Sequence, residues 1–176
     1  LFEGIDFSWN RIQSDSKLQL KLNELINQFD HDNPANSVRT LLELRYMISR
    51  LNDDFWKEKK MTQIDEILRQ CLGLFVEVTT LSSSKTKGDT CSFNIEIINR
   101  STQEVKFRNF EILESDFSQN YNEELPFNQA INIKNKWVIS KTTKISQPYW
   151  LVNPSNLGGS VVNDQLLIGH PESLPS

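Results

Sequence analysis

The chain has 176 residues, of which 38% are apolar and 10% aromatic, so it can bury one good core or two small ones. Its net charge is −4, and the acidic excess is the same up to Gly73, with 12 acids against 10 bases, as after it, with 11 against 9. This even balance supplies no basic stripe and argues against nucleic-acid binding. No apolar run approaches the roughly 18–20 residues of a membrane helix, which argues against a membrane protein.

The first part of the chain is typical of helices. Between residues 16 and 73, apolar side chains recur with a 3.6-residue period in three stretches: 18–29, 38–51 and 55–72. Pro34 separates the first two stretches, because the residue before a proline is pushed out of the helical region. Gly73 is well placed to end the third stretch in a left-handed conformation. Since connections this short favour antiparallel neighbours, we predict a three-helix unit.

After Gly73 the apolar period changes from 3.6 residues to 2. Six strands are predicted, over residues 74–81, 90–98, 105–113, 130–133, 137–145 and 161–168. The polar residues 115–124 are predicted to be a loop. Short strands with no helical pattern between them favour an antiparallel sandwich. The predicted fold class is therefore α+β, with a helical segment over residues 1–73 and an immunoglobulin-like β-sandwich over residues 74–176.

The reactive side chains predict no catalytic, metal or cofactor site. A catalytic zinc ion usually takes about three protein ligands, and the only two histidines, His31 and His170, lie far apart in the sequence. Two aspartates flank His31, and we interpret that segment as a solvated interhelical loop. Cys71 and Cys91 fall on apolar faces, where free thiols behave as small apolar side chains, although a disulfide between them stays open. No histidine neighbours either thiol in sequence to activate it as a nucleophile.

Several aromatic side chains in the second part are candidates for stacking on sugar rings, namely Trp137, Tyr149 and Trp150. Packing is the preferred interpretation, because aromatic side chains bury a large area with one polar group. A coplanar exposed pair would favour carbohydrate binding, and buried rings would favour packing. The triplet Asn99-Arg100-Ser101 matches the N-glycosylation pattern, with a simple hairpin turn as the preferred alternative.

The opening residues 1–12 are unusually apolar for a chain end and include Phe2, Phe7 and Trp9. Two interpretations stay open. The segment folds back on the chain's own helices, or it continues a missing catalytic domain and packs against that domain through these three side chains. The second interpretation predicts an exposed apolar patch of several hundred Å² on the isolated chain. Since the chain starts with Leu1 inside this segment, we expect it to be part of a larger protein.

The order of several segments resembles a known family. The opening LFEGIDFSWNRI, then FDHDNPANSVRTLLELRYMISRL, and then FWKEKKMTQIDEILRQCLGL resemble the region that follows the catalytic domain in Bacteroidetes-type PIG-L/LmbE-like deacetylases. The later segments GDTCSFNIEIINRS, QPYWL and DQLLIGHPE extend the resemblance over nearly the whole chain.

The resemblance implies a parent protein that is a zinc-dependent deacetylase of N-acetyl groups, often those of sugars. The family's His-Pro-Asp-Asp motif and its His-x-x-His pair do not occur in this sequence, so no catalytic or metal residue is carried over. We therefore expect a non-catalytic accessory region without a cofactor, whose partner is the catalytic domain of the same parent chain. The alternative is a carbohydrate-binding module. Localisation stays open, with periplasm or secretion as the options considered.

Overall fold

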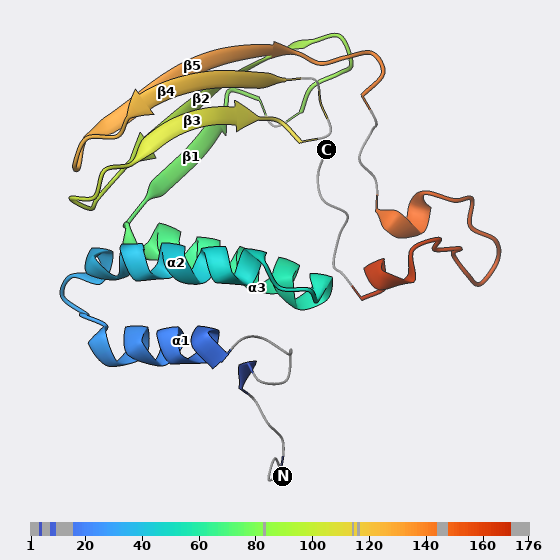
Figure 1. Ribbon diagram of the computed structural model, residues 1–176. Helices are drawn as coiled ribbons and strands as arrows, with labels where there is room; N and C mark the ends of the chain where they lie inside the picture. Colours follow the sequence, from blue (N-terminus) through green and yellow to red (C-terminus); the bar gives the residue numbers. More distant parts are fainter. Residues whose placement is uncertain are drawn as a thin grey trace. The chain divides into compact units, whose positions relative to one another are not determined.

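The computed structural model of the chain describes residues 16–82, 84–113, 117–143 and 148–169, together with residues 4, 8, 9 and 115. Three helices precede antiparallel strands in two sheets, so the α+β fold class is confirmed (Figure 1). The chain divides into two compact units, and the division passes through all five strands. The first unit holds the described residues up to Thr79, Asn94–Phe107 and Asn122–Lys134. The second holds Thr80–Phe93, Arg108–Tyr121 and the described residues from Asn135 on.

The three predicted helices are confirmed. They are α1 (Ser16–Gln28), α2 (Val38–Ser49), which a 3-10 turn at Pro34–Ser37 precedes, and α3 (Asp54–Cys71). The carboxylate of Asp53 caps α3 by accepting a hydrogen bond from the Trp56 amide at 3.0 Å. Gly73 ends the helical segment with φ +56°, and a Cβ there would lie 3.0 Å from the Cβ of Arg100. Both conformation and space therefore favour glycine at this position.

The helical core lies in the first unit, with α2 contacting both α1 and α3. The buried apolar side chains of the three helices form one cluster: Leu18, Val38, Leu41, Leu44, Ile48, Ile64 and Leu68. Two ion pairs hold the outer helices to α2. Lys21 of α1 reaches Glu43 at 2.8 Å, and Arg45 binds the carboxylate of Asp65 of α3 through two nitrogens. The arrangement follows from the 3.6-residue period, which places each apolar stripe toward α2.

The strands form a three-stranded sheet and a two-stranded sheet. The first has the order β1 (Phe75–Thr80), β2 (Thr90–Ile98) and β5 (Ala130–Val138), and the second pairs β3 (Lys106–Glu111) with β4 (Ser118–Glu124). The predicted alternation along β2 is confirmed, because Phe93, Ile95 and Ile97 are buried while Cys91 is half-buried. The central strand thus supplies the most deeply buried side chains of the β part.

The second unit contains a cluster of three phenylalanines. The ring of Phe93 on β2 lies 5.5 Å from that of Phe110 on β3 and 5.5 Å from that of Phe117. The rings of Phe110 and Phe117 are 6.3 Å apart and nearly perpendicular. Edge-to-face contacts of this kind are favoured by the aromatic quadrupole. The tilted contact between Phe93 and Phe110, at an interplanar angle of 37°, brings a strand of the first sheet into contact with a strand of the second.

Residues 115–124, predicted to be a loop, contain strand β4, and this prediction was wrong. The strand is Ser118–Glu124, and its side chains are exposed except for the half-buried Tyr121. A strand that packs little side-chain area is held by its backbone pairing with β3. Composition therefore did not indicate it, since β-propensity mostly reports fit to a half-buried surface.

Two further strand predictions are corrected. Residues 130–133 and 137–145 were expected to be separate strands, but β5 runs unbroken from Ala130 to Val138. The polar residue between the two apolar runs, Asn135, lies at an inward position and donates a hydrogen bond to the Tyr121 hydroxyl, which gives its polar side chain a partner on β4. Residues 144–147 lie outside the described residues.

The last predicted strand, at 161–168, does not form, although the structure describes all of these residues. Gln165–Leu167 forms a 3-10 turn instead, because the carboxylate of Asp164 accepts a hydrogen bond from the Leu166 amide at 3.0 Å. A capping aspartate offers the backbone a local partner that competes with a strand ladder.

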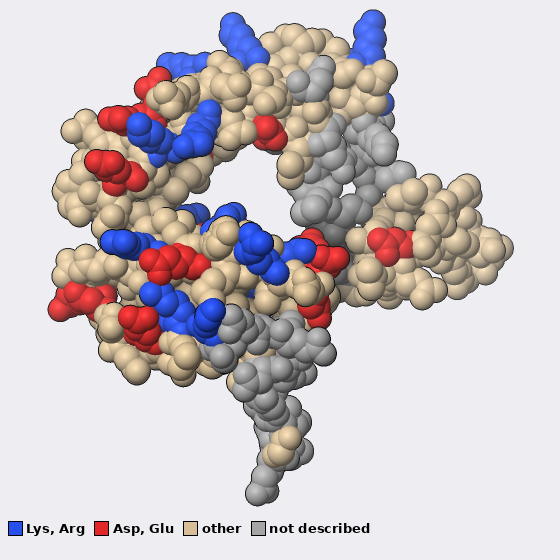
Figure 2. Space-filling view, in the orientation of Figure 1, with Lys and Arg blue, Asp and Glu red and all other residues tan. Residues whose placement is uncertain are grey.

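Surface charge on the helices is mixed. Figure 2 shows acidic and basic side chains interspersed over the visible face of the helices, in agreement with the balance read from the sequence. No helix in the part of the chain that the structure describes is long and apolar enough to span a membrane.

Candidate functional site

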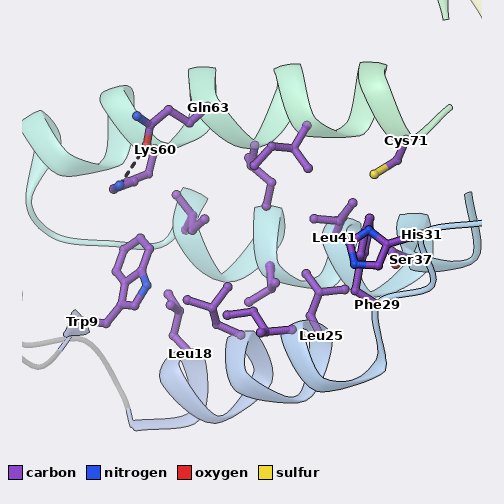
Figure 3. Close-up of a pocket in the computed structure, with 16 residues that line it drawn as sticks. Trp9, Leu18, Leu25, Phe29, His31, Ser37, Leu41, Lys60, Gln63 and Cys71 are labelled. Atoms are coloured by element: carbon purple, nitrogen blue, oxygen red, sulfur yellow. Dashed lines mark hydrogen bonds between the residues drawn. The ribbon is translucent and has the colours of Figure 1, made fainter. Parts of the chain in front are cut away.

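An apolar groove runs along the helical layer of the first unit, between α1 and α3 and over α2 (Figure 3). Its volume is about 510 Å³, within the range of ligand sites in proteins. Eleven of the described residues that line it are apolar, and five are polar or thiol-bearing: His31, Ser37, Lys60, Gln63 and Cys71. The groove therefore offers a long apolar surface with few polar groups.

The floor and the rims of the groove differ in exposure. Leu18 and Leu44 on the floor are each only 2% exposed, while the rim residues Ile26 and Ile67 are 63% and 46% exposed. Leu18 lies on the apolar stripe predicted for the first helix, whereas the stripe predicted for the second helix was partly wrong, because it included Leu42, which is 52% exposed, and left out the buried Leu44. The rim residues lie next to the floor positions on α1 and α3, so each stripe is wider than its contact with α2 requires.

One end of the groove carries a cation beside aromatic rings. The Lys60 ammonium lies 5.8 Å from the ring centroid of Trp9 and 5.8 Å from that of Trp56. It also donates a hydrogen bond to the Gln63 side-chain oxygen at 2.9 Å. An ammonium over an aromatic face is attracted by the ring quadrupole, so these contacts hold Lys60 at the mouth of the groove.

The other end of the groove carries a thiol that is poorly suited to chemistry. Partial burial raises the pKa of the Cys71 thiol, and desolvation is the cause. A raised pKa keeps the sulfur protonated, whereas the thiolate is the nucleophile. Cys71 and Cys91 are both free, so the disulfide that the sequence left open is not formed.

The segment around His31 is a turn held by its own carboxylate. The side chain of Asp30 accepts hydrogen bonds from the Asp32 amide at 3.0 Å and from the Asn33 side chain at 3.3 Å, and these bonds lower the pKa of Asp30. His31 contacts the ring of Phe29 edge to face at 4.9 Å. Among the described residues, no three His, Cys, Asp or Glu side chains are grouped so that they could hold a metal ion. His170 lies outside the described residues.

The structure places one of the predicted aromatic contact residues of the chain's opening segment. Trp9 lines the groove and packs against the helical core, and its backbone amide donates to the Gln19 side chain at 3.2 Å. For this residue the contact is with the chain's own helices, as the fold-back interpretation expects. Phe2 and Phe7 lie outside the described residues.

The aromatic side chains suggested for carbohydrate binding do not form a flat platform. Tyr149 and Trp150 are half-buried on a 3-10 turn, and their rings meet at 88° with centroids 4.8 Å apart. Trp137 is half-buried on β5, and its indole nitrogen is buried without a hydrogen-bond partner. Perpendicular rings cannot both stack on one sugar face, so this geometry weakens the carbohydrate alternative.

The N-glycosylation pattern is a buried structural turn. Asn99 is 1% exposed, and its side-chain nitrogen donates to the carbonyl oxygens of Gln103 at 2.9 Å and Leu125 at 3.2 Å. Its side-chain oxygen accepts from the Ser101 amide and hydroxyl. With its amide fully engaged, Asn99 serves as a hub that ties together two segments of the first unit.

Sequence reasoning missed the groove itself. The apolar stripes of α1 and α3 were assigned wholly to the helical core, yet Ile26 and Ile67 are exposed at its rims. The available signal was stripe width, since three helices that only cover one another need narrower apolar faces.

Comparisons with known proteins identify no relative, because no family model, no curated protein and no solved structure matches the chain.

Proposed function

We propose that this chain is a non-catalytic accessory region of a PIG-L/LmbE-like deacetylase, which supports the catalytic domain of its parent or positions the substrate there. The observation that carries the binding role is the groove, an apolar site of about 510 Å³ with a cation at one end. The lining groups suit binding better than catalysis, because the thiol of Cys71 has a raised pKa and no Asp or Glu is among the described lining residues. The family assignment rests on the resemblance of the sequence segments.

We also propose that the strands form an immunoglobulin-like sandwich. In that fold the first, second and fifth strands share one sheet, and the third lies in the other. The order β1-β2-β5 agrees with this pattern, and so does the contact between Phe93 and Phe110, whereas the pairing of β4 with β3 differs from the constant-type fold, in which the fourth strand lies in the first sheet. Hydrogen exchange tests the proposal, since the amides of β2, paired on both sides, should exchange most slowly among the strands. Faster exchange in β2 than in β1 and β5 would contradict it.

The accessory role is tested by comparing the full-length parent with its catalytic domain alone on an N-acetyl sugar substrate. Removal of this region should raise KM several-fold and leave kcat nearly unchanged, because it removes binding and no reacting group. A large fall in kcat at constant KM would show that the region supplies catalytic groups, and would overturn the proposal.

A groove variant of the full-length parent makes the same test without deletion. Ile67→Glu places a charge at the apolar rim and should raise KM as the deletion does. The matched control is Leu42→Glu on the outer side of α2, since Leu42 is 52% exposed and is not among the groove residues. Equal KM values for the two variants would mean that the groove takes no part.

A further inference from the structure

The groove has properties that narrow the class of its ligand. Its floor is nearly closed to water, with Leu18 and Leu44 2% exposed, although its rims are open. A docking α-helix with its side chains is about 10–12 Å across and would need a broad exposed floor. Because the buried lining side chains leave little exposed floor, the groove fits a slender chain better than a helix.

The length of the groove suits an extended apolar chain. The lining residues of α3 run from Lys60 to Cys71, which at a rise of about 1.5 Å per residue spans roughly 16 Å. Over this length the walls are mostly leucine and isoleucine side chains of α1, α2 and α3, with Phe29 just beyond the end of α1. Such a wall gives few directional hydrogen bonds, so it favours a flexible hydrocarbon over a polar polymer.

The charge of the groove is confined to the Lys60 end. Lys60 has three ammonium donors, and one goes to the Gln63 side chain. Within the described part of the chain, no carboxylate forms an ion pair with Lys60. The remaining donors can therefore bind an anion at the mouth, next to the Trp9 ring (Figure 3).

We propose that the groove binds a single-chain amphiphile with an anionic headgroup, such as a free fatty acid. The headgroup lies at Lys60 and the hydrocarbon tail runs toward Phe29 and Cys71. The inference rests on the proposed function, because it takes the groove to be the binding surface of the accessory region. It adds the class of ligand that binds there. Burial of the tail supplies most of the affinity, and the charge-assisted hydrogen bond to Lys60 selects the headgroup.

Isothermal titration calorimetry with sodium dodecanoate, below the concentration at which it forms micelles, tests the proposal. The chain should bind one dodecanoate at least tenfold more tightly than dodecyltrimethylammonium, which has the same tail and the opposite charge. Lys60→Gln should weaken dodecanoate binding about tenfold, as expected for loss of a charge-assisted hydrogen bond. Lys59→Gln is the matched control, because Lys59 contacts Phe55 and Trp56 but is not among the groove residues, and it should change affinity less than twofold.

Fluorescence quenching tests the direction of the ligand. Because Trp9 and Trp56 both lie near the Lys60 ammonium, 2-bromododecanoate should quench tryptophan fluorescence more than 12-bromododecanoate, and Trp9→Phe should reduce the difference. Absence of saturable binding, equal affinity for both headgroups, an unaffected Lys60→Gln variant or the opposite order of quenching would each overturn the inference.

If dodecanoate fails to bind while Ile67→Glu still raises the KM of the parent, only the ligand class fails. If dodecanoate binds at Lys60 while Ile67→Glu leaves KM unchanged, the accessory role fails and the ligand assignment stands.

Discussion

The helical layer and the phenylalanine cluster solve the same problem of apolar burial in different ways. In the helical layer each helix presents a stripe to α2, and the stripes of α1 and α3 extend beyond that contact, which leaves a groove with exposed isoleucines at its rims. In the second unit, Phe93, Phe110 and Phe117 meet one another, with Phe93 buried and the other two half-buried. The comparison indicates that the excess apolar surface of the helices is available for a ligand, whereas the aromatic cluster is structural.

The largest expected effect concerns the aromatic cluster. Phe93→Ala removes a buried ring that contacts two others, and should lower the free energy of unfolding by about 3–5 kcal/mol. The neighbouring Asn94 lies on the opposite face of β2 and bonds Asn132, so Asn94→Ala should cost clearly less. Urea denaturation measures both. Equal losses would mean that the facing of β2 is misassigned.

The second prediction compares two leucines of α2. Leu44 is 2% exposed on the groove floor, and Leu44→Ala should cost about 2–5 kcal/mol because it leaves a cavity. Leu42 is 52% exposed, and Leu42→Ala should stay within about 0.5 kcal/mol. If the groove floor can relax more easily than the aromatic cluster, Leu44→Ala will lie at the low end of its range. A Leu44→Ala variant as stable as Leu42→Ala would show that the floor is not part of the core.

The third prediction concerns the buried turn at Asn99. Asn99→Ala leaves the carbonyl oxygens of Gln103 and Leu125 without their partner, at a cost of about 1–3 kcal/mol. Asn109→Ala is the control, because Asn109 is exposed and its side-chain nitrogen donates a hydrogen bond to the nearby Glu111 carboxylate. Thermal unfolding should separate the two variants. A glycan attached to Asn99 in the folded protein would contradict its burial.

The smallest expected effect is electrostatic. Hydrogen bonds from Arg69 and Gln70 lower the pKa of the Glu66 carboxyl from 4.5 to about 2. Because the folded pKa is the lower one, the stabilisation is fully present above about pH 4.5 and is lost as the pH falls toward 2. The difference in melting temperature between the wild type and Glu66→Gln should therefore be small, and should shrink over this interval. A difference that persists unchanged at pH 2 would contradict the assignment.

The elements with strong apolar periodicity could be predicted from the sequence, and those held by polar contacts could not. The helices and β2 follow the apolar pattern closely, because burial of one stripe or one face decides them. Strand β4 was missed because backbone pairing rather than side-chain burial holds it. Strand β5 continues through the polar Asn135, whose side-chain partner Tyr121 is distant in sequence.

The sequence by itself determined the α+β class, the change from helix to strand at Gly73 and the inward face of β2, since local periodicity and a left-handed glycine encode them. Only the tertiary structure decided that α1 and α3 flank α2 and leave a groove, and that Lys60 stands at its end beside Trp9. It also decided that the glycosylation pattern is a buried hub at Asn99. The physical reason is that a stripe specifies which side chains are apolar, while the distance between helices specifies which of them remain open to a ligand.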